Sequence, residues 1–330
     1  MTTPRIPSWT RRHSLQALAA ALVVPAGWSL AQPSGGRASR LITGSPPGSL
    51  GDVLARLVGQ KLTEAAGQPA VVDNRLGAAG AIAADAVAKA APDGQTLLVV
   101  PDTVMVVNPF VYPKLAYNPE RDFRGVALLG KASLMLAVSP SLNVRSFAEF
   151  VRLVKSKPRA VNYGTGGAGH PTHVIMELIC SRLGLQMTHV PYKGTSPAMQ
   201  GLLAGEVGAM IVGMAEGLPQ LRTGKAIALA SSGPSAREML PGLPELKEFH
   251  PDLDVAVWFA AFAPAATPRE IIAAVSAEIY KALAQPDVRK RLADYGLAVQ
   301  PMAPAELDEF ARNERARYGP LIKALGLVAE

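Results

Sequence analysis

The sequence has one cysteine and few aromatic residues, and both shortages limit what the chain can be. Its only cysteine, Cys180, cannot form an internal disulfide and lies far from any N-terminal lipid-anchor position, so we expect it in the core. Aromatic residues make up 5% of the 330 residues, whereas hydrophobic residues make up 49%. This composition argues against disorder and favours an α/β fold in which helices pack on sheets through small side chains. At this length we expect two domains or one large unit.

Long hydrophobic runs are also absent. No stretch beyond the N-terminal region has the roughly 18 consecutive apolar residues of a membrane span, so we expect the mature chain to be soluble. The N-terminal region combines the pair Arg11-Arg12, an apolar run and small residues up to Ala31, as export signals do. We therefore expect a signal peptide over 1–31 cleaved near Ala31, a linker over 32–38, and a location in the periplasm. General secretion and twin-Arg export both stay open, and an amphipathic N-terminal arm is the alternative.

A strong charge of either sign is missing from the expected mature chain. The formal net charge is +7, but three of the 33 basic residues lie in the expected signal, leaving 30 against 26 acidic residues, or +4. The basic residues are scattered rather than clustered, so we expect no nucleic-acid partner. A mild positive balance is compatible with a small anionic ligand.

The common motifs of enzymes and metal sites are missing as well. The sequence has no G-x-S-x-G elbow, no Walker motif and no paired metal motif. His170 and His173 form H-x-x-H, but no third ligand stands at a supporting spacing. We therefore expect no catalytic residue, metal or cofactor. An exported enzyme would require a constellation of side chains that these motifs do not describe.

The most informative feature that is present is a glycine-rich loop between a strand and a helix. Residues 161–163 form a β-type segment, and Pro171 suits the first turn of a helix with apolar residues at helical spacing. A helix start has unpaired N–H groups and partial positive charge, so the loop predicts a site for a small anion. The loop also fits the dinucleotide fingerprint G-x-G-x-x-G. The next strand, 188–190, ends without the carboxylate that would hold a ribose, so we do not expect a dinucleotide.

Strand, tight loop and helix recur along the chain. The first unit has a strand over 40–44, a loop over 45–51 and a helix over 52–66 with an apolar face. Capping boxes are predicted at two helix starts, Ser146–Glu149 and Thr267–Glu270. Repeated βα units predict parallel sheets covered on both faces, with ligands beyond the carboxyl ends of the strands. Further strands are predicted at 70–73, 96–100, 134–138, 188–190, 208–212, 226–230 and 256–262.

Several segments, in this order, resemble one known family. They are 40–52 (RLITGSPPGSLGD), 74–80 (NRLGAAG), 91–96 (APDGQT), 162–173, 190–194 (VPYKG), 198–205 and 258–268 (WFAAFAPAATP). Together they resemble the Bug family, the periplasmic solute receptors of tripartite tricarboxylate transporters, over essentially the whole mature chain. The resemblance implies an α/β fold of two Rossmann-like lobes, the type II periplasmic binding protein fold, which closes like a Venus flytrap. It places lobe one at 39–140 plus 256–330 and lobe two at 141–255.

The resemblance also implies what the lobes bind. The expected ligand is a small carboxylate, a di- or tricarboxylic or an aromatic acid, which a monomeric receptor delivers to the membrane permease subunits of a tripartite tricarboxylate transporter. A ligand sensor that acts on a signalling partner is the alternative. The residues implied to contact the ligand are Pro46, Pro47, Gly48 and Ser49 from lobe one, and Thr165, Gly166, Gly167, Ala168, Gly169, His173, Tyr192, Lys193 and Gly194 from lobe two.

Two positions depart from the usual pattern of that family. Ser49 stands in place of the second glycine after Pro-Pro-Gly and adds a hydroxyl near the expected anion. Gly213-Met214 follows the strand over 208–212, where the family commonly has an aspartate. Because that carboxylate would pair with an ammonium group, its absence leads us to expect a ligand without a free amine.

Overall fold

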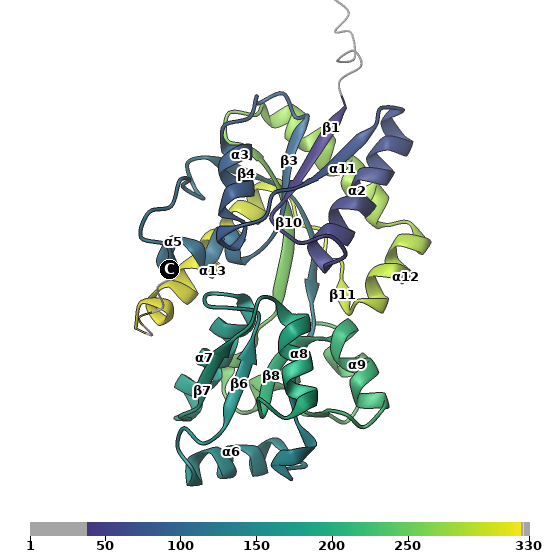
Figure 1. Cartoon of the computed structure of the whole chain (residues 1–330). Helices are drawn as coiled ribbons and strands as arrows, with labels where there is room; N and C mark the ends of the chain where they lie inside the picture. Colours follow the sequence, from purple (N-terminus) through teal and green to yellow (C-terminus); the bar gives the residue numbers. More distant parts are fainter. Residues whose placement is uncertain (1–37, 325, 327–330) are drawn as a thin grey trace, which may run out of the picture. The chain divides into compact units, whose positions relative to one another are not determined.

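The computed structural model describes residues 38–324 and residue 326, which belong to one compact unit. The expected signal peptide over 1–31 and nearly all of the expected linker lie outside the described residues. Within the compact unit the strands form two sheets with helices packed on them, which confirms the α/β class (Figure 1).

The first sheet, called sheet A here, has six strands in the order β11-β4-β10-β3-β1-β2. Its strands are β1 (Ser39–Thr43), β2 (Ala70–Asn74), β3 (Thr96–Pro101), β4 (Phe123–Ala132), β10 (Val257–Pro264) and β11 (Leu297–Ala298). All eight residues of β10 are buried, and several of them are alanines. The helices of this part of the chain are α2 (Leu50–Ala66), α3 (Ala81–Ala88), α4 (Thr103–Val106), α5 (Asn108–Val111), α11 (Arg269–Leu283), α12 (Pro286–Asp294) and α13 (Pro304–Ala324), with the 3-10 turn η1 (Ala78–Gly80).

The second sheet, sheet B, has five strands in the order β7-β6-β8-β5-β9. Its strands are β5 (Leu134–Val138), β6 (Asn162–Thr165), β7 (Thr188–Pro191), β8 (Ala209–Gly213) and β9 (Ile227–Ser232). Its helices are α6 (Phe147–Ser156), α7 (Pro171–Leu183), α8 (Thr195–Ala204), α9 (Met214–Arg222) and α10 (Ala236–Met239), with the 3-10 turns η2 (Pro140–Leu142), η3 (Leu246–Glu248) and η4 (Pro251–Leu253). Cys180 is buried in α7, as expected, and burial raises the pKa of its thiol to about 12.

Neither sheet is wholly parallel, so the expectation of parallel sheets is wrong in part. β10 runs antiparallel to β3 and β4, and β5 runs antiparallel to β8 and β9. The reason is that β5 and β10 are the strands through which the chain enters a new sheet. A chain that crosses without a helix in between enters from the opposite end, so its first strand opposes those built from βα units.

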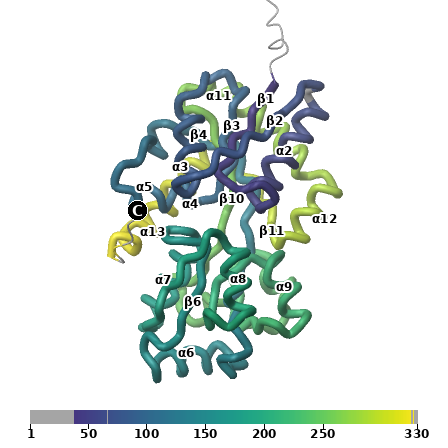
Figure 2. The backbone as a smooth tube through the Cα atoms, in the orientation of Figure 1, coloured from purple at the N-terminus to yellow at the C-terminus, as the bar shows by residue number. Residues whose placement is uncertain are grey.

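The chain changes sheet at two places. A single residue, Ser133, separates β4 of sheet A from β5 of sheet B, and the segment 254–256 leads back to β10 (Figure 2). The expected division of the lobes at residue 140 would place β5 with sheet A, whereas its pairing partners are the strands of sheet B.

Of the two predicted capping boxes, the one at Ser146–Glu149 is nearly correct and the one at Thr267–Glu270 is wrong. The Ser146 hydroxyl accepts a bond from the Glu149 N–H at 3.2 Å, but the Glu149 carboxylate accepts from the N–H of Arg145, one residue before the cap. At the second helix start α11 is capped by no side chain, and the Thr267 hydroxyl is buried without a partner among the described residues.

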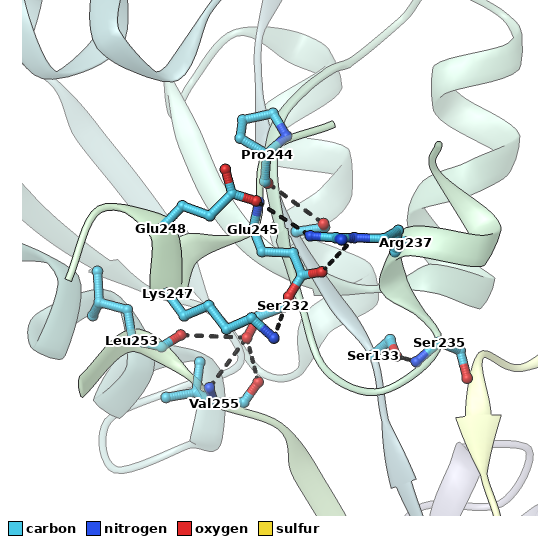
Figure 3. Close-up of polar contacts among 11 residues, drawn as sticks. Ser133, Ser232, Ser235, Arg237, Pro244, Glu245, Lys247, Glu248, Leu253 and Val255 are labelled. Carbon is cyan, nitrogen blue, oxygen red and sulfur yellow. Dashed lines mark hydrogen bonds and ion pairs between the residues drawn. The ribbon is translucent and has the colours of Figure 1, made fainter. Parts of the chain in front are cut away.

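Serine side chains tie both crossing segments to the end of β9 (Figure 3). The buried Ser232 hydroxyl donates to the Val255 carbonyl at 2.5 Å and accepts from the Val255 N–H at 3.1 Å. The Ser133 hydroxyl accepts from the N–H of Ser235 at 2.9 Å. Because each bond joins a crossing segment to sheet B, these serines fix where the chain leaves that sheet.

We expect Ser232→Ala to lower the free energy of unfolding by about 1–3 kcal/mol, because both polar groups of Val255 lose their partner in a buried setting. Urea unfolding of the purified protein measures the change. The matched control is Ser235→Ala, which removes a hydroxyl that caps no helix and should change stability by less than about 0.5 kcal/mol. Equal effects of the two substitutions would contradict the prediction.

Candidate functional site

A cavity of about 730 Å³ is lined by residues of both sheets. Lining residues follow five strands at their carboxyl ends: Gly44 after β1, Pro101 at the end of β3, Gly166 after β6, Lys193 after β7 and Gly213 at the end of β8. This is where α/β sheets place their ligands. The remaining lining residues are Ser45, Pro46, Gly48, Ser49, Leu50, Gly51, Ala79, Thr103, Tyr112, Ala132, Leu134, Ala168, His170, Pro171, Thr172, Gly194, Thr195, Ser196, Ala215, Glu216, Val257, Phe259 and Tyr295.

The structure brings about half of the sequence-predicted site residues together at this cavity. Those that line it are Pro46, Gly48, Ser49, Gly166, Ala168, Lys193 and Gly194. The others do not line it: Pro47, Thr165, Gly167, Gly169, His173 and Tyr192. The Tyr192 hydroxyl instead donates to Glu206 at 3.1 Å, and its ring lies against Gly201.

The Pro-Pro-Gly loop is a β-turn held by a buried carboxylate. The Ser49 N–H donates to the Pro46 carbonyl at 3.1 Å, and Gly48 has a φ of 81°, which favours glycine. Asp52 accepts from the Gly48 N–H at 2.9 Å, from Arg56 at 3.0 Å and from the Asn74 side chain at 2.8 Å. The Gly48 amide is therefore occupied, so the turn shapes the cavity wall and does not offer that amide to a ligand.

Three helices begin at the cavity without a side-chain cap. They are α2 after Ser49, α8 after Gly194 and α9 after Gly213. Among the described residues the amides of Leu50 and Ser196 have no acceptor, as expected for the first turn of an uncapped helix, whereas the Met214 N–H at the start of α9 donates to the Ser133 carbonyl at 3.3 Å. The Ser49 hydroxyl donates to the Pro46 carbonyl at 2.7 Å and so does not cap α2. Three positive helix ends at one cavity favour a negatively charged ligand.

The glycine-rich loop, by contrast, uses most of its amides internally. The Gly166 N–H donates to the Thr172 hydroxyl at 3.1 Å, and the Gly169 N–H donates to His173 Nδ1 at 3.1 Å. The Gly167 N–H donates to the Thr165 hydroxyl at 3.2 Å. Only the Ala168 amide of this loop is left without an acceptor in the described part of the chain. The loop is therefore a rigid wall rather than the cradle of main-chain donors that its glycines suggested.

His173 belongs to the support behind this wall. Its ring is buried and stacks on His189 with ring centroids 3.7 Å apart. Burial and the neighbouring rings of His189 and His170 lower the pKa of His173 to about 4. His189 Nε2 lies 2.6 Å from the Thr165 hydroxyl, and the Tyr163 hydroxyl donates to Glu177. His173 thus positions the loop through its acceptor nitrogen and stays neutral.

His170, which the sequence did not single out as a contact, lines the cavity instead. Its Nδ1 accepts from the Thr172 N–H at 3.3 Å and caps α7, and it lies 2.9 Å from the Thr172 hydroxyl. Because Nδ1 is an acceptor, the ring proton of the neutral side chain is on Nε2. The ring covers Gly166, where a Cβ would lie 2.8 Å from its atoms, so this position requires glycine. Burial lowers the pKa of His170 to about 4, so the ring presents a neutral donor.

Several other lining residues lie in the first turns of helices or at helix ends, and none of them was among the predicted site residues. Thr195 and Ser196 bring hydroxyls from the first turn of α8, and Glu216 brings a carboxylate from the first turn of α9. Tyr112 and Tyr295 add phenol rings from the sheet A side. The uncapped glycine before α8 was the available signal for the hydroxyls. No strand-end motif indicated the tyrosines or Glu216.

None of the helices within 38–324 is both long enough and apolar enough to cross a membrane. No group of three or more histidine, cysteine, aspartate or glutamate side chains in the same residues is arranged to hold a metal ion.

The turn that Asp52 holds leads to a pH-dependent prediction. Burial alone would raise the pKa of this carboxyl, but hydrogen bonds from Arg56, Gly48 and Asn74 outweigh burial and lower it below 3.8. A lowered carboxyl pKa stabilises the fold above the usual value, and that stability is lost as the pH falls through the folded value. We expect Asp52→Asn to lower the free energy of unfolding by about 3 kcal/mol at pH 7.

The difference between wild type and Asp52→Asn should shrink below about pH 4, where the wild-type carboxylate takes up its proton. Urea unfolding at neutral and acidic pH measures it. The exposed Asp294 makes no hydrogen bond or ion pair within the described chain, so Asp294→Asn is the control and should be neutral. A pH-independent loss in Asp52→Asn would refute the role of the charged form.

His170, at the start of α7, leads to a second prediction about how the stability of the fold depends on pH. The unfolded chain protonates His170 near pH 6.5, whereas the folded chain resists protonation until about pH 4. The stability that depends on the neutral ring therefore falls as the pH drops between these values. In His170→Asn, which keeps a capping oxygen, we expect the loss of stability from pH 7 to about pH 4.5 to be smaller than in wild type by at least 1 kcal/mol. His170→Ala should lose about 1 kcal/mol at pH 7 as well. The same pH dependence in wild type and His170→Asn would show that the ring is not buried as a neutral group.

The family model that matches the chain is described as the tripartite tricarboxylate transporter family receptor, and it matches residues 54–327. A protein from the tcbD-tcbE intergenic region of Pseudomonas sp. strain P51 is 34% identical over 84% of this chain and 83% of its own length. Protein BugT of Bordetella pertussis is 32% identical over 88% of this chain and 90% of its own.

Solved structures are similar to this chain over a comparable share of its length. Rpa4515 of R. palustris, solved with adipate, is 30% identical with a TM-score of 0.81, covering 90% of this chain and 99% of that one. MatC of Rhodopseudomonas palustris, solved with bound malate, is 33% identical with a TM-score of 0.77, covering 88% of this chain and all of the other. These likenesses confirm the periplasmic binding protein fold with its two lobes. The chain belongs to the tripartite tricarboxylate transporter receptor family, which includes the Bug proteins.

Proposed function

We propose that the chain is a receptor outside the cytoplasm that binds a small carboxylate between its two lobes and delivers it to the permease of a tripartite tricarboxylate transporter. The observation that carries this proposal is the meeting of three uncapped helix starts at one cavity lined by both sheets. Helix starts stabilise a carboxylate through N–H groups that have no other partner. Family membership supports the same role, since this is a family of receptors.

The cavity also has an apolar side that would hold the body of the ligand. Val257 and Phe259 line it from β10, and Leu134 lines it from β5. A pocket of apolar walls with a few polar groups is typical of small-molecule sites. The relatives solved with adipate and with malate support a carboxylate as the ligand here.

Location, partner and movement are part of the proposal. An export signal over 1–31 would bring the receptor to the periplasm, where it would act as a monomer that carries no catalytic group. The lobe around sheet A and the lobe around sheet B would close on the ligand by bending at Ser133 and at 254–256, the two places where the chain crosses. Closure would exclude water and so strengthen each polar contact.

The proposal predicts stabilisation by ligand without turnover. A thermal-shift screen of the processed protein should include adipate, malate, benzoate and citrate. A bound acid raises the unfolding free energy by RT ln(1 + [L]/Kd), about 2.7 kcal/mol at a hundredfold excess over Kd. Unchanged ligand recovered after incubation distinguishes a receptor from an enzyme. If no carboxylate raises the melting temperature, the proposed function is wrong.

Lys193 lines the cavity and has no ion pair within the described chain. We expect Lys193→Gln to weaken binding of any acid found in that screen by roughly tenfold, since a charge-assisted hydrogen bond is lost. Lys225→Gln removes an exposed charge outside the lining residues and serves as the control. Equal affinities of the two variants would place the carboxylate elsewhere in the cavity.

A further inference from the structure

The formal charges that line the cavity are few and opposite. Lys193 is its only lysine or arginine, and Glu216 is its only carboxylate, among the described lining residues. His170 adds a neutral ring. The lining side chains therefore sum to no net charge, and the attraction for an anion comes from one lysine and the helix starts. This balance suits a ligand with one carboxylate better than one with two or three.

The only carboxylate among the described residues that line the cavity, that of Glu216, has no partner in this part of the chain. Asp52 is held by three donors, Glu177 accepts from Tyr163, and Glu206 accepts from Tyr192. No hydrogen bond or ion pair joins Glu216 to any other described residue. Its carboxylate oxygens are therefore available to a donor that enters the cavity.

The geometry of α9 explains why this carboxylate is available. Met214 and Gly217 are buried and lie three residues apart, so they define the face that packs on sheet B. Glu216 lies on another face of the same first turn, where it lines the cavity. Beside it, a Cβ on Gly213 would meet nothing within 4 Å. There is therefore open space at Gly213, directly before α9, for a group of the ligand.

We propose that Glu216 accepts a hydrogen bond from a donor group on the ligand, a hydroxyl or an ammonium, at the end away from the carboxylate that Lys193 and the starts of α2 and α8 bind. The ligand class is then a carboxylate with a distal donor rather than a symmetrical dicarboxylate. This inference rests on the proposed function. It replaces the expectation, drawn from Gly213-Met214, that the ligand has no amine, because Glu216 supplies a carboxylate two residues further on.

The sheet sets the distance between the two ends. Lys193 follows β7 and Glu216 follows β8, and β6 lies between these strands in sheet B. Two inter-strand spacings separate the strand ends by roughly 10 Å. An extended chain of four to six carbons is therefore the appropriate scale for probes.

The test is a titration calorimetry comparison of matched acids. The probes are adipate, ω-hydroxyhexanoate and ω-aminohexanoate, with the corresponding five- and four-carbon series. We expect wild type to bind the best hydroxy or amino acid at least tenfold more tightly than the dicarboxylate of equal length, as a hydrogen bond to a charged group implies. The affinities of the hydroxy acids and of the amino acids, compared at equal length, show which donor group the site prefers.

Two variants assign the preference to one side chain. Glu216→Gln keeps the size of the side chain but lets it donate to a second carboxylate, so the preference should fall by tenfold or more or reverse. Glu238→Gln removes an exposed glutamate of α10 on the same lobe and should leave the preference unchanged. Melting temperatures of the unliganded variants show whether the fold is retained.

The outcomes separate this inference from the proposed function. Tighter binding of a dicarboxylate by wild type, or a preference that Glu216→Gln does not change, overturns the inference and leaves a carboxylate receptor standing. Binding of benzoate or citrate alone has the same consequence. If no carboxylate binds, the proposed function itself fails.

Discussion

The site depends on three helix starts without side-chain caps, and at two of them, α2 and α8, the amides of Leu50 and Ser196 have no acceptor among the described residues. Among the described α-helices only α6 and α7 have a side-chain cap, from Ser146 and His170. At α2, α8 and α9 the capping positions have no side-chain acceptor for the N–H groups of the first turn, although each helix begins at the cavity. An uncapped helix start costs stability unless water or a ligand supplies the acceptor. What distinguishes α2, α8 and α9 is therefore their place at the cavity, where a ligand can supply the missing acceptors.

Side-chain acceptors then hold the loops that surround these helix starts. Asp52 fixes the Pro-Pro-Gly turn from behind, and Thr172 and His173 fix the glycine-rich loop in the same manner. Each of them consumes an amide that could otherwise bind ligand. The gain is a wall whose shape does not depend on the ligand, and preorganised walls reduce the entropy lost on binding.

Local patterns predicted most strands and helices, but they missed what depends on distant contacts. The strand β4 went unrecognised because its glycines look like breakers in sequence. A Cβ at Gly125 would lie 2.9 Å from Leu307, and one at Gly130 would lie 2.6 Å from Leu297, so both glycines serve packing between remote segments. The direction of β5 was missed for a similar reason. Strand propensity carries no information about which sheet a strand joins.

The residues of the site differ in the same way: local sequence patterns predicted some of them, whereas contacts between distant segments determine the others. The turn around Gly48 and the helix start at Gly194 could be found, since a small-residue turn before a helix is a local signal. The buried position of His173 could not, because it follows from stacking on His189. Nor could the role of Glu216, since the sequence predicted no helix after β8. A carboxylate that is missing at the end of a strand can be supplied from the first turn of the next helix, because that turn begins at the same edge of the sheet. The chemistry of a ligand site must therefore be inferred from all the side chains that line the cavity.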